Sequence, residues 1–396
     1  MELIHLPASA LRFGQVLEFS IYDAGGKLLL ARGQVLRNTP LGQQLIASGG
    51  WVQPHETKEY QRAVAHQADT LMHQGATLGA IASARPDYKY ERPPTPQFTG
   101  LQAWTDLQLR AHSLLRDPRP EDFQRRFDEL LQDMQGRMQQ QPDATLLLLV
   151  FEAGQGFDHY SARHGLLVMA LAELCARQLG WAEDLRDVLA RAAMSMNIAI
   201  TTLQDRLAAQ ADRMSDAHRR EIASHGDRGA ELLRSLGVHD SLWLQVVRLH
   251  HEAGPGPLEG RSMAEQMARL IKRADIYAAR LSPRRTRRAL SAAQAAHAVY
   301  LDELQQPDTV GNTLLKAVGL YPPGALVRLA SGEVGVAIKR GHSANEPIVA
   351  SLLGKSGAPW SEPVRRDTRL AAQAIAACLA PHELKLLVSL EKLLKL

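Results

Sequence analysis

The chain has few aromatic residues and only two cysteines in a length of 396 residues. Aromatic side chains make up 5% of the sequence, whereas hydrophobic residues make up 45%, so the cores must be filled chiefly by aliphatic side chains, which favours helices. Cys175 and Cys378 lie far apart, each in an Ala/Leu-rich segment that predicts a helix. We therefore expect buried thiols in a reducing compartment rather than a disulfide.

Long apolar runs are also absent. No window of about 18 apolar residues occurs, as a membrane-spanning helix would need, and the first 14 residues lack a basic segment followed by an apolar one, so we expect no signal peptide. The net charge, 46 minus 42 or +4, gives no argument for a nucleic-acid partner. These absences predict a soluble, cytoplasmic protein with no membrane span.

The first 100 residues predict a small module and a linker. Two apolar runs, 15–22 and 27–30, flank the hairpin signal Ala-Gly-Gly, and 33–36 adds a short strand. Thr39 then predicts the N-cap of a helix that ends at Ser48. Residues 1–55 are thus expected to form a β-rich module, either a docking or sensory unit or a plain structural cap. The proline-rich, polar stretch 56–100 predicts a linker.

Residues 101–320 predict a helical domain, because their apolar residues recur with helical spacing. A break at 117–120 separates two helices within 101–140. The further predicted helices cover 143–151, 164–179, 185–200, 215–236, 241–251, 262–281, 291–304 and 309–318.

Residues 321–396 predict a last subdomain. Alternating apolar residues indicate a β-hairpin over 326–338, and 347–353 is a candidate third strand. Helices are expected over 368–379 and 382–396. The last carries a leucine stripe, with Leu384, Leu387, Leu390 and Leu394, which packs either on its own domain or on a second subunit.

Five residues of metal-ligating type recur on the predicted helices: His164, His225, His250, His251 and Asp275. Each alone has a structural explanation. Asp275, for example, lies in an apolar helix and would need a partner such as Arg273 or Arg280, because burying an unpaired carboxylate is costly. In this order they indicate a metal site inside a helical domain.

Several short segments accompany these residues. They are Tyr160 before His164, Ala-Ala-Met-Ser-Met-Asn-Ile-Ala-Ile at 192–200, His225 with Gly229, His-His-Glu at 250–252, Ala-Asp-Ile-Tyr-Ala-Ala at 274–279, Ser-Pro-Arg-Arg-Thr-Arg at 282–287 and Tyr-Pro-Pro-Gly at 321–324. From about residue 142 to 340 this series resembles the HD-GYP family, a branch of the HD phosphohydrolase superfamily. The resemblance implies a mainly α fold built on an HD-type helical bundle, and descent from metal-dependent hydrolases of cyclic di-GMP.

The chain departs from the family at three places. Met196 and Asn197 stand where the family has its His-Asp pair, and Ile200 stands where it has a lysine. A thioether suits iron or manganese poorly, and a neutral amide does not replace a bridging carboxylate. The loop after His-His-Glu, Asp-Gly-x-Gly-Tyr-Pro in the family, is Ala-Gly-Pro-Gly-Pro at 253–257. We therefore assign no catalytic residue.

The resemblance also implies what is retained. It groups His225, His250 and His251 at one metal, and three imidazoles suit a single Zn²⁺ or Fe²⁺ with an open position; manganese is the family's other metal. It places His164 and Asp275 at a second, underfilled position. Arg284 and Arg287 match cationic contacts to the ligand's phosphates, although 280–288 also reads as an exposed basic segment.

Three hypotheses follow. The first is a degenerate HD-GYP signalling protein that no longer hydrolyses cyclic di-GMP but binds the nucleotide, a metal or a protein. The second is a phosphodiesterase acting on cyclic di-GMP or a related phosphoester through a residual mononuclear site. The third is an adaptor that binds a partner, or a second copy of itself as a homodimer, through the N-terminal module or the C-terminal helix.

Overall fold

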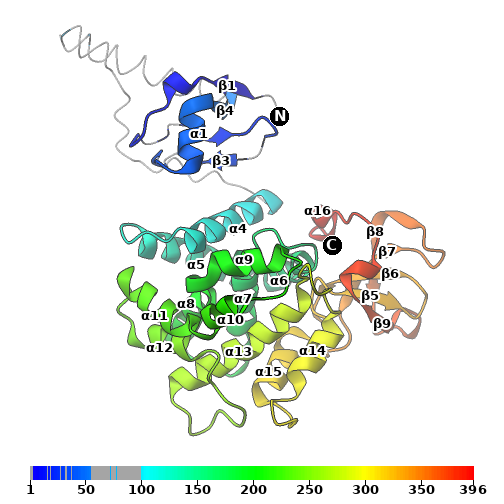
Figure 1. The fold of residues 1–396 in the computed structure, drawn as a ribbon. Coiled ribbons are helices and arrows are strands. Elements are labelled where there is room, and N and C mark those ends of the chain that lie inside the picture. Colours follow the sequence, from blue (N-terminus) through cyan, green and yellow to red (C-terminus); the bar gives the residue numbers. More distant parts are fainter. Residues whose placement is uncertain are drawn as a thin grey trace. The chain divides into compact units, whose positions relative to one another are not determined.

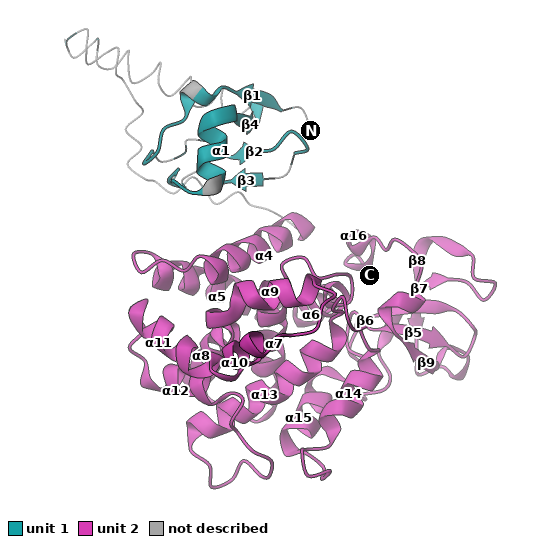
Figure 2. Cartoon of the chain, in the orientation of Figure 1, with its two compact units in different colours: residues 1–97 teal, residues 98–396 magenta. Residues whose placement is uncertain are grey.

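A computed structural model describes residues 3–54 except 16, 18, 27, 32, 33 and 37, the single residues 72 and 77, and residues 100–396. The chain forms two compact units, Met1–Gln97 and Phe98–Leu396 (Figures 1 and 2). The expected linker 56–100 falls almost entirely outside the described residues, as do residues 27 and 33 of the expected strands. The four-part division with boundaries at 55, 100 and 320 stays a prediction.

The first unit holds a small antiparallel sheet in the order β1-β4-β2-β3, with one helix and the 3₁₀ turn η1 (Ala8–Ala10). Its strands are β1 (Ile4–Leu6), β2 (Ile21–Tyr22), β3 (Leu28–Leu30) and β4 (Gly50–Val52). Helix α1 (Pro40–Ser48) begins after Thr39, whose hydroxyl accepts a hydrogen bond from the Gly42 N–H at 3.1 Å. It ends at Gly49, whose φ of 76° is in the left-handed region. The expected hairpin and helix are both confirmed.

The second unit is dominated by helices, as the sequence predicts. They are α4 (Gly100–Arg116), α5 (Phe123–Gln140), α6 (Pro142–Ala153), α7 (Tyr160–Gln178), α8 (Glu183–Ser195), η2 (Ile198–Ile200), α9 (Thr201–Ala209), α10 (Asp216–Ala223), α11 (His225–Ser235), α12 (Ser241–Leu249), α13 (Met263–Leu281), α14 (Ala292–Tyr300) and α15 (Thr309–Val318). Two expected helices are interrupted: 185–200 breaks near Asn197, and 215–236 breaks at Ser224, because both residues leave the helical backbone conformation. None of the described helices is long and apolar enough to cross a membrane.

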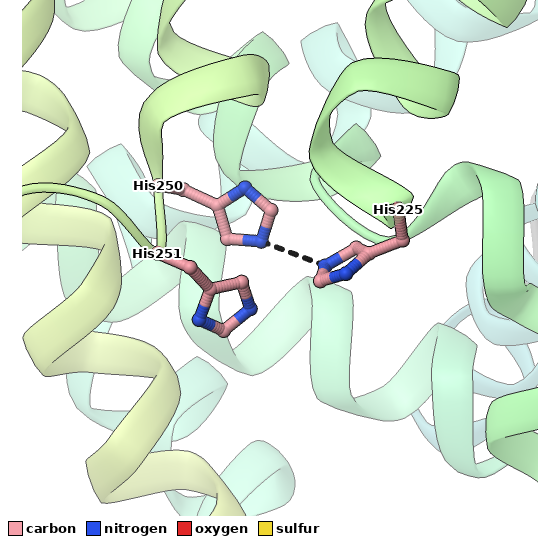
Figure 3. A group of neighbouring side chains, drawn as sticks. All are labelled: His225, His250 and His251. Atoms are coloured by element: carbon pink, nitrogen blue, oxygen red, sulfur yellow. Dashed lines mark hydrogen bonds between the residues drawn. The ribbon is translucent and has the colours of Figure 1, made fainter. Parts of the chain in front are cut away.

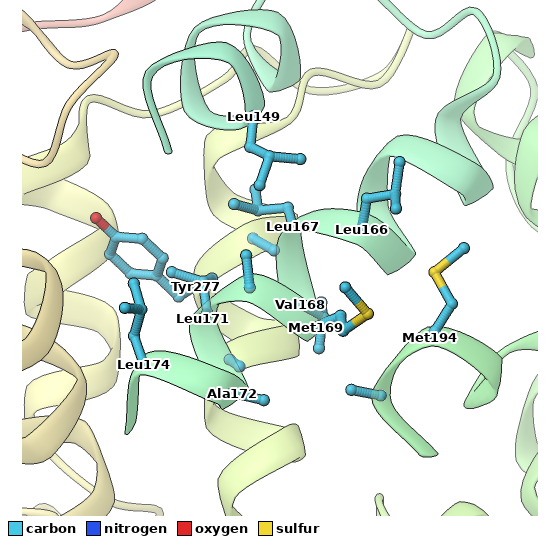
Figure 4. Packing of buried hydrophobic residues seen from close by; sticks show 14 of the residues in the cluster. Leu149, Leu166, Leu167, Val168, Met169, Leu171, Ala172, Leu174, Met194 and Tyr277 are labelled. Atoms are coloured by element: carbon cyan, nitrogen blue, oxygen red, sulfur yellow. The ribbon is translucent and has the colours of Figure 1, made fainter. Parts of the chain in front are cut away.

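Helix α7 is the centre of this unit. Every residue of it except Arg163, Arg177 and Gln178 is buried, and it packs against α4, α6, α8, α9, α13 and α15. In Figure 4 its leucines lie between Leu149 of α6, Met194 of α8 and Tyr277 of α13. A helix that is apolar on every side needs partners on every side, so the other helices are arranged around it.

A five-stranded antiparallel sheet completes the second unit, in the order β8-β7-β6-β5-β9. Its strands are β5 (Leu326–Leu329), β6 (Val334–Lys339), β7 (Ile348–Leu353), β8 (Pro359–Asp367) and β9 (Ile375–Leu379). The expected hairpin and third strand are confirmed. The sequence did not reveal β8.

The two helices expected at the C-terminus are wrong. Residues 375–379 form β9, which pairs with β5 so that Leu326 faces Leu379, and beyond it lie only η4 (Pro381–Glu383) and the short α16 (Leu390–Leu393). The free edge of β5 offers backbone hydrogen bonds that outweigh the helix preference of an alanine-rich segment. Cys378 therefore lies in a strand, whereas Cys175 is buried in α7; both thiols are free.

The leucine stripe is likewise not one helix face. Leu387 is fully exposed, whereas Leu393, outside the expected stripe, is 2% exposed and belongs to the core. The short α16 packs against α4 and β8 of its own unit.

A half-buried histidine of α4 lies outside the predicted site. The ring of His112 contacts that of His159, with centroids 4.1 Å apart, and its Nδ1 is 3.9 Å from Oδ2 of Asp205. Burial, with the charge of His159, lowers the pKa of His112 to about 4, and Asp205 only partly opposes this. The folded chain therefore binds fewer protons here than the unfolded chain does at pH values between this pKa and the ordinary one.

We predict that acidification from pH 7 to pH 5 destabilises the protein partly through His112. Because the folded pKa is below the unfolded one, this contribution to stability is present above the unfolded pKa and is lost as the pH falls toward the folded pKa. His112→Gln should lose less unfolding free energy than the wild type between these pH values, measured by urea titration. His297→Gln, at an exposed position of α14, is the control. Equal pH dependence in wild type and His112→Gln would contradict the prediction.

Candidate metal centre

Three histidines from two adjacent helices face one another (Figure 3). His225 is the first residue of α11, and His250 and His251 follow the last residue of α12, so the packing of α11 on α12 brings them together. One ligand atom from each lies within 4.8 Å of the others. His225 and His250 are buried, and His251 is exposed to solvent.

Backbone carbonyls fix how two of these rings are oriented. Nδ1 of His250 donates to the Val247 carbonyl at 2.6 Å, and Nδ1 of His225 donates to the Ile222 carbonyl. A carbonyl only accepts, so in the neutral rings both Nε2 atoms carry lone pairs, yet they lie 3.0 Å apart. Two lone pairs at this distance repel each other unless a proton or a cation lies between them. Together with His251, this donor set fits one transition-metal ion.

The electrostatics of the group suit a metal. Burial, reinforced by His251 and His225, lowers the pKa of His250 to about 3, and burial also lowers the pKa values of His225 and His251. The three rings are therefore neutral at physiological pH, the form that coordinates a metal ion. The negative charge of Asp275 acts on all three histidines and favours a cation among them.

The other two expected ligands bind each other. Nε2 of His164 lies 2.6 Å from Oδ1 of Asp275. Burial alone would raise the pKa of Asp275, but the hydrogen bond and charge of His164 outweigh it and hold the pKa at about 2. The expected partner Arg273 instead contacts Asp308 and the carbonyl of Leu301. The buried carboxylate is thus paired with a histidine rather than with an arginine.

The two arginines assigned to phosphate are used differently. The Arg284 guanidinium lies over the ring of Tyr160 at 5.4 Å, and that ring stacks on His164 with centroids 5.7 Å apart. Arg287 donates to the carbonyls of Ala279 and Ser282. Arg284 therefore lies one ring away from His164, whereas Arg287 holds the shape of the loop.

The positions that depart from the family motif are occupied by apolar packing. Met196 is 1% exposed and belongs to the main core. Ile200 packs in a separate apolar cluster with Leu203, Leu207, Met214 and Ile222. The shortened loop is tied down as well, because Lys272 donates to the Ala253 carbonyl at 3.0 Å and Arg261 donates to the carbonyls of Pro255 and Pro257.

Sequence reasoning missed the groups that orient the ligands. The carbonyls of Ile222 and Val247 each lie three residues before the histidine that they hold. That spacing is the only signal the sequence offers, and it is common to every helix.

Comparison with known proteins shows what the chain is similar to. No family model matches the chain. Over 226 residues the chain is 27% identical to a cyclic di-GMP phosphodiesterase of Pseudomonas aeruginosa, covering 56% of this chain and 54% of that protein. With the ordered motifs and the helical fold, this relative confirms the expected resemblance. The chain is similar to HD-GYP proteins. It spans about half the length of the curated relative that it matches.

A solved HDG"Y"P protein from Bdellovibrio bacteriovorus is also similar to this HD-GYP-like chain. The match has a TM-score of 0.44 at 15% sequence identity, and covers 79% of this chain and 98% of the other.

We predict that His225→Ala and His250→Ala each abolish metal binding. Wild-type protein loaded with Zn²⁺ and desalted should hold about one equivalent, and either variant less than about 0.2, because two imidazoles make an incomplete site. Elemental analysis measures the content, and the exposed His239→Ala is the control. Binding should also weaken as the pH falls, because protons compete for the Nε2 atoms. Full metal content in both variants would rule out this site.

Proposed function

We propose that this HD-GYP-like chain is a degenerate signalling module that holds one transition-metal ion and a cyclic di-GMP-type nucleotide without hydrolysing it. The observation that carries the proposal is a contrast within one site. Three neutral histidines converge, with the Nε2 atoms of His225 and His250 3.0 Å apart, while Met196, Ile198 and Ile200 of the neighbouring segment are packed into apolar clusters.

The loss of hydrolysis follows from what a two-metal site requires. Such a site clamps the attacking and leaving oxygens between two ions, and the resemblance assigns the bridging carboxylate to position 197. Asn197 is neutral there, and Met196 is committed to the core. The lysine position is Ile200, inside an apolar cluster where no cation can face a phosphate. The pairing of His164 with Asp275 further engages both residues of the second metal position.

Separate residues support the proposal that the chain still binds a metal ion and a nucleotide. His225, His250 and His251 would hold the metal, and a bound Zn²⁺ or Fe²⁺ would supply a positive charge and an open coordination position to a phosphate oxygen. Arg284, next to Tyr160, would add a cationic donor at the edge of the site. The module would then act in the cytoplasm by coupling nucleotide binding to a protein contact, for instance through the N-terminal unit or in a homodimer.

One observation favours the alternative of a mononuclear phosphodiesterase. His251 is exposed to solvent while its two partners are buried, so a metal held by the three would be reachable by water and substrate. A single ion with three histidine ligands and an open position is able to activate water.

We predict that the full chain binds cyclic di-GMP but releases no linear or mononucleotide product with Mn²⁺, Fe²⁺ or Zn²⁺, because the bridging carboxylate and lysine are absent. Chromatography of the nucleotide after incubation measures product, and the Pseudomonas relative serves as the positive control. Robust metal-dependent turnover that His250→Ala abolishes would establish the mononuclear alternative instead.

We further predict that Met196→His with Asn197→Asp does not restore full activity. Ile200 and the loop 253–257 would still leave the leaving group and substrate without their contacts. Adding Ile200→Lys should raise turnover above that of the double variant, measured in the same product assay. Turnover by the double variant equal to that of the active relative would show that position 200 and the loop do not matter.

A further inference from the structure

A hollow of about 370 Å³ lies beside Arg284, on the side of α9 and its connection to α10. Its lining includes Leu207, Gln210, Arg213, Met214, Arg219 and Arg284. The N–H of Arg285 donates to the Ala208 carbonyl at 2.8 Å, which ties the loop that carries Arg284 to α9. This backbone hydrogen bond therefore fixes the loop of Arg284 beside α9, and the hollow lies between them.

The hollow carries an excess of positive charge. Three guanidinium groups line it, against one carboxylate, that of Asp212. Within the described residues no carboxylate lies within ion-pair distance of Arg213 or Arg284, and the pair that Arg219 makes with Asp216 is exposed and therefore weak. Nε of Arg284 is buried and has no hydrogen-bond partner in the described protein. A buried, unpaired guanidinium donor is costly and is relieved by an anion.

The other wall of the hollow is apolar. Leu207 and Met214 line the hollow and also belong to the apolar cluster of Ile200, Leu203 and Ile222. Replacement of the family lysine by Ile200 thus contributes to an apolar surface that reaches the hollow. A ligand with an anionic group next to an apolar part would match both walls, and a purine nucleotide has both.

The hollow is linked to the histidine site through stacked rings. Arg284 lies over Tyr160, Tyr160 stacks on His164, and His164 is hydrogen-bonded to Asp275, whose charge acts on the three histidines. A nucleotide phosphate at Arg284 would therefore be connected to the three histidines through Tyr160, His164 and Asp275.

We infer that this hollow is a nucleotide subsite, in which Arg213 and Arg219 join Arg284 around a phosphate and Leu207 with Met214 contacts the purine base. The inference rests on the proposed function, which supplies the nucleotide. It adds two phosphate contacts outside the motifs of the family resemblance, Arg213 on the connection between α9 and α10 and Arg219 on α10. Ile200 belongs to the apolar cluster that supplies Leu207 and Met214 to the hollow.

The test is equilibrium binding to the full chain in the presence of a chelator, so that metal and turnover do not contribute. Cyclic di-GMP, GMP, guanosine and inorganic phosphate are titrated separately. Arg213→Gln with Arg219→Gln should weaken cyclic di-GMP binding at least about tenfold, the effect of lost charge-assisted hydrogen bonds. Arg220→Gln, on the same helix but outside the lining, is the matched control and should bind as the wild type does. Met214→Ser should weaken binding of GMP but not of inorganic phosphate.

The outcomes separate this inference from the proposed function. If the double arginine variant binds cyclic di-GMP as tightly as the wild type does, the subsite is overturned. The proposed function stays intact in that case, provided that the bound nucleotide is not hydrolysed. Hydrolysis by the metal-loaded wild type overturns the proposed function, while a tenfold loss in the chelated variant still supports the subsite. If inorganic phosphate binds as tightly as GMP, the assignment of a base contact is overturned. If the chain binds none of the nucleotides, the subsite as a whole is overturned.

Discussion

The burial of α7 is the constraint on which the second unit depends. A helix that is apolar on all sides must be enclosed, and six other helices pack against it. Its first turns also carry Tyr160 and His164 to the edge of the candidate site. This buried helix thereby contacts Arg284 through Tyr160 and Asp275 through His164. The same helix therefore forms the centre of the core and supplies two residues of the candidate site.

The geometry of the histidine group is independent of the positions that depart from the family motif. Its geometry depends on the packing of α11 on α12 and on two backbone carbonyls, and neither requires Met196, Asn197 or Ile200 to be polar. Replacing a buried charged group with a well-packed apolar one is often neutral or stabilising. Met196 and Ile200 fill apolar clusters, so the stretch that the resemblance links to catalysis now contributes to packing. The convergence of the three histidines therefore does not depend on which residues occupy positions 196, 197 and 200.

Sequence reasoning succeeded where the signals are local. The cap at Thr39, the helix over Thr309–Val318 and the hairpin after residue 325 are set by neighbouring residues and by periodicity, and the structure has all three. It failed over 368–379 and 382–396, where alanine and leucine predict a helix. Residues 375–379 pair instead with β5, almost fifty residues earlier in the chain. A long-range backbone pairing leaves no local pattern in a strand that lies at a sheet edge.

The candidate site likewise has features that the sequence determines and features that depend on the tertiary structure. The sequence by itself determined the ligand types, their order and the departures at 196, 197 and 200, because these are matters of residue identity. Only the tertiary structure decided that His225, His250 and His251 converge, that Asp275 pairs with His164 rather than with Arg273, and that Arg287 serves its own loop while Arg284 lies over the ring of Tyr160. Which partner a buried polar group finds depends on distances between helices that are remote in sequence, and those distances are fixed only when the core has packed.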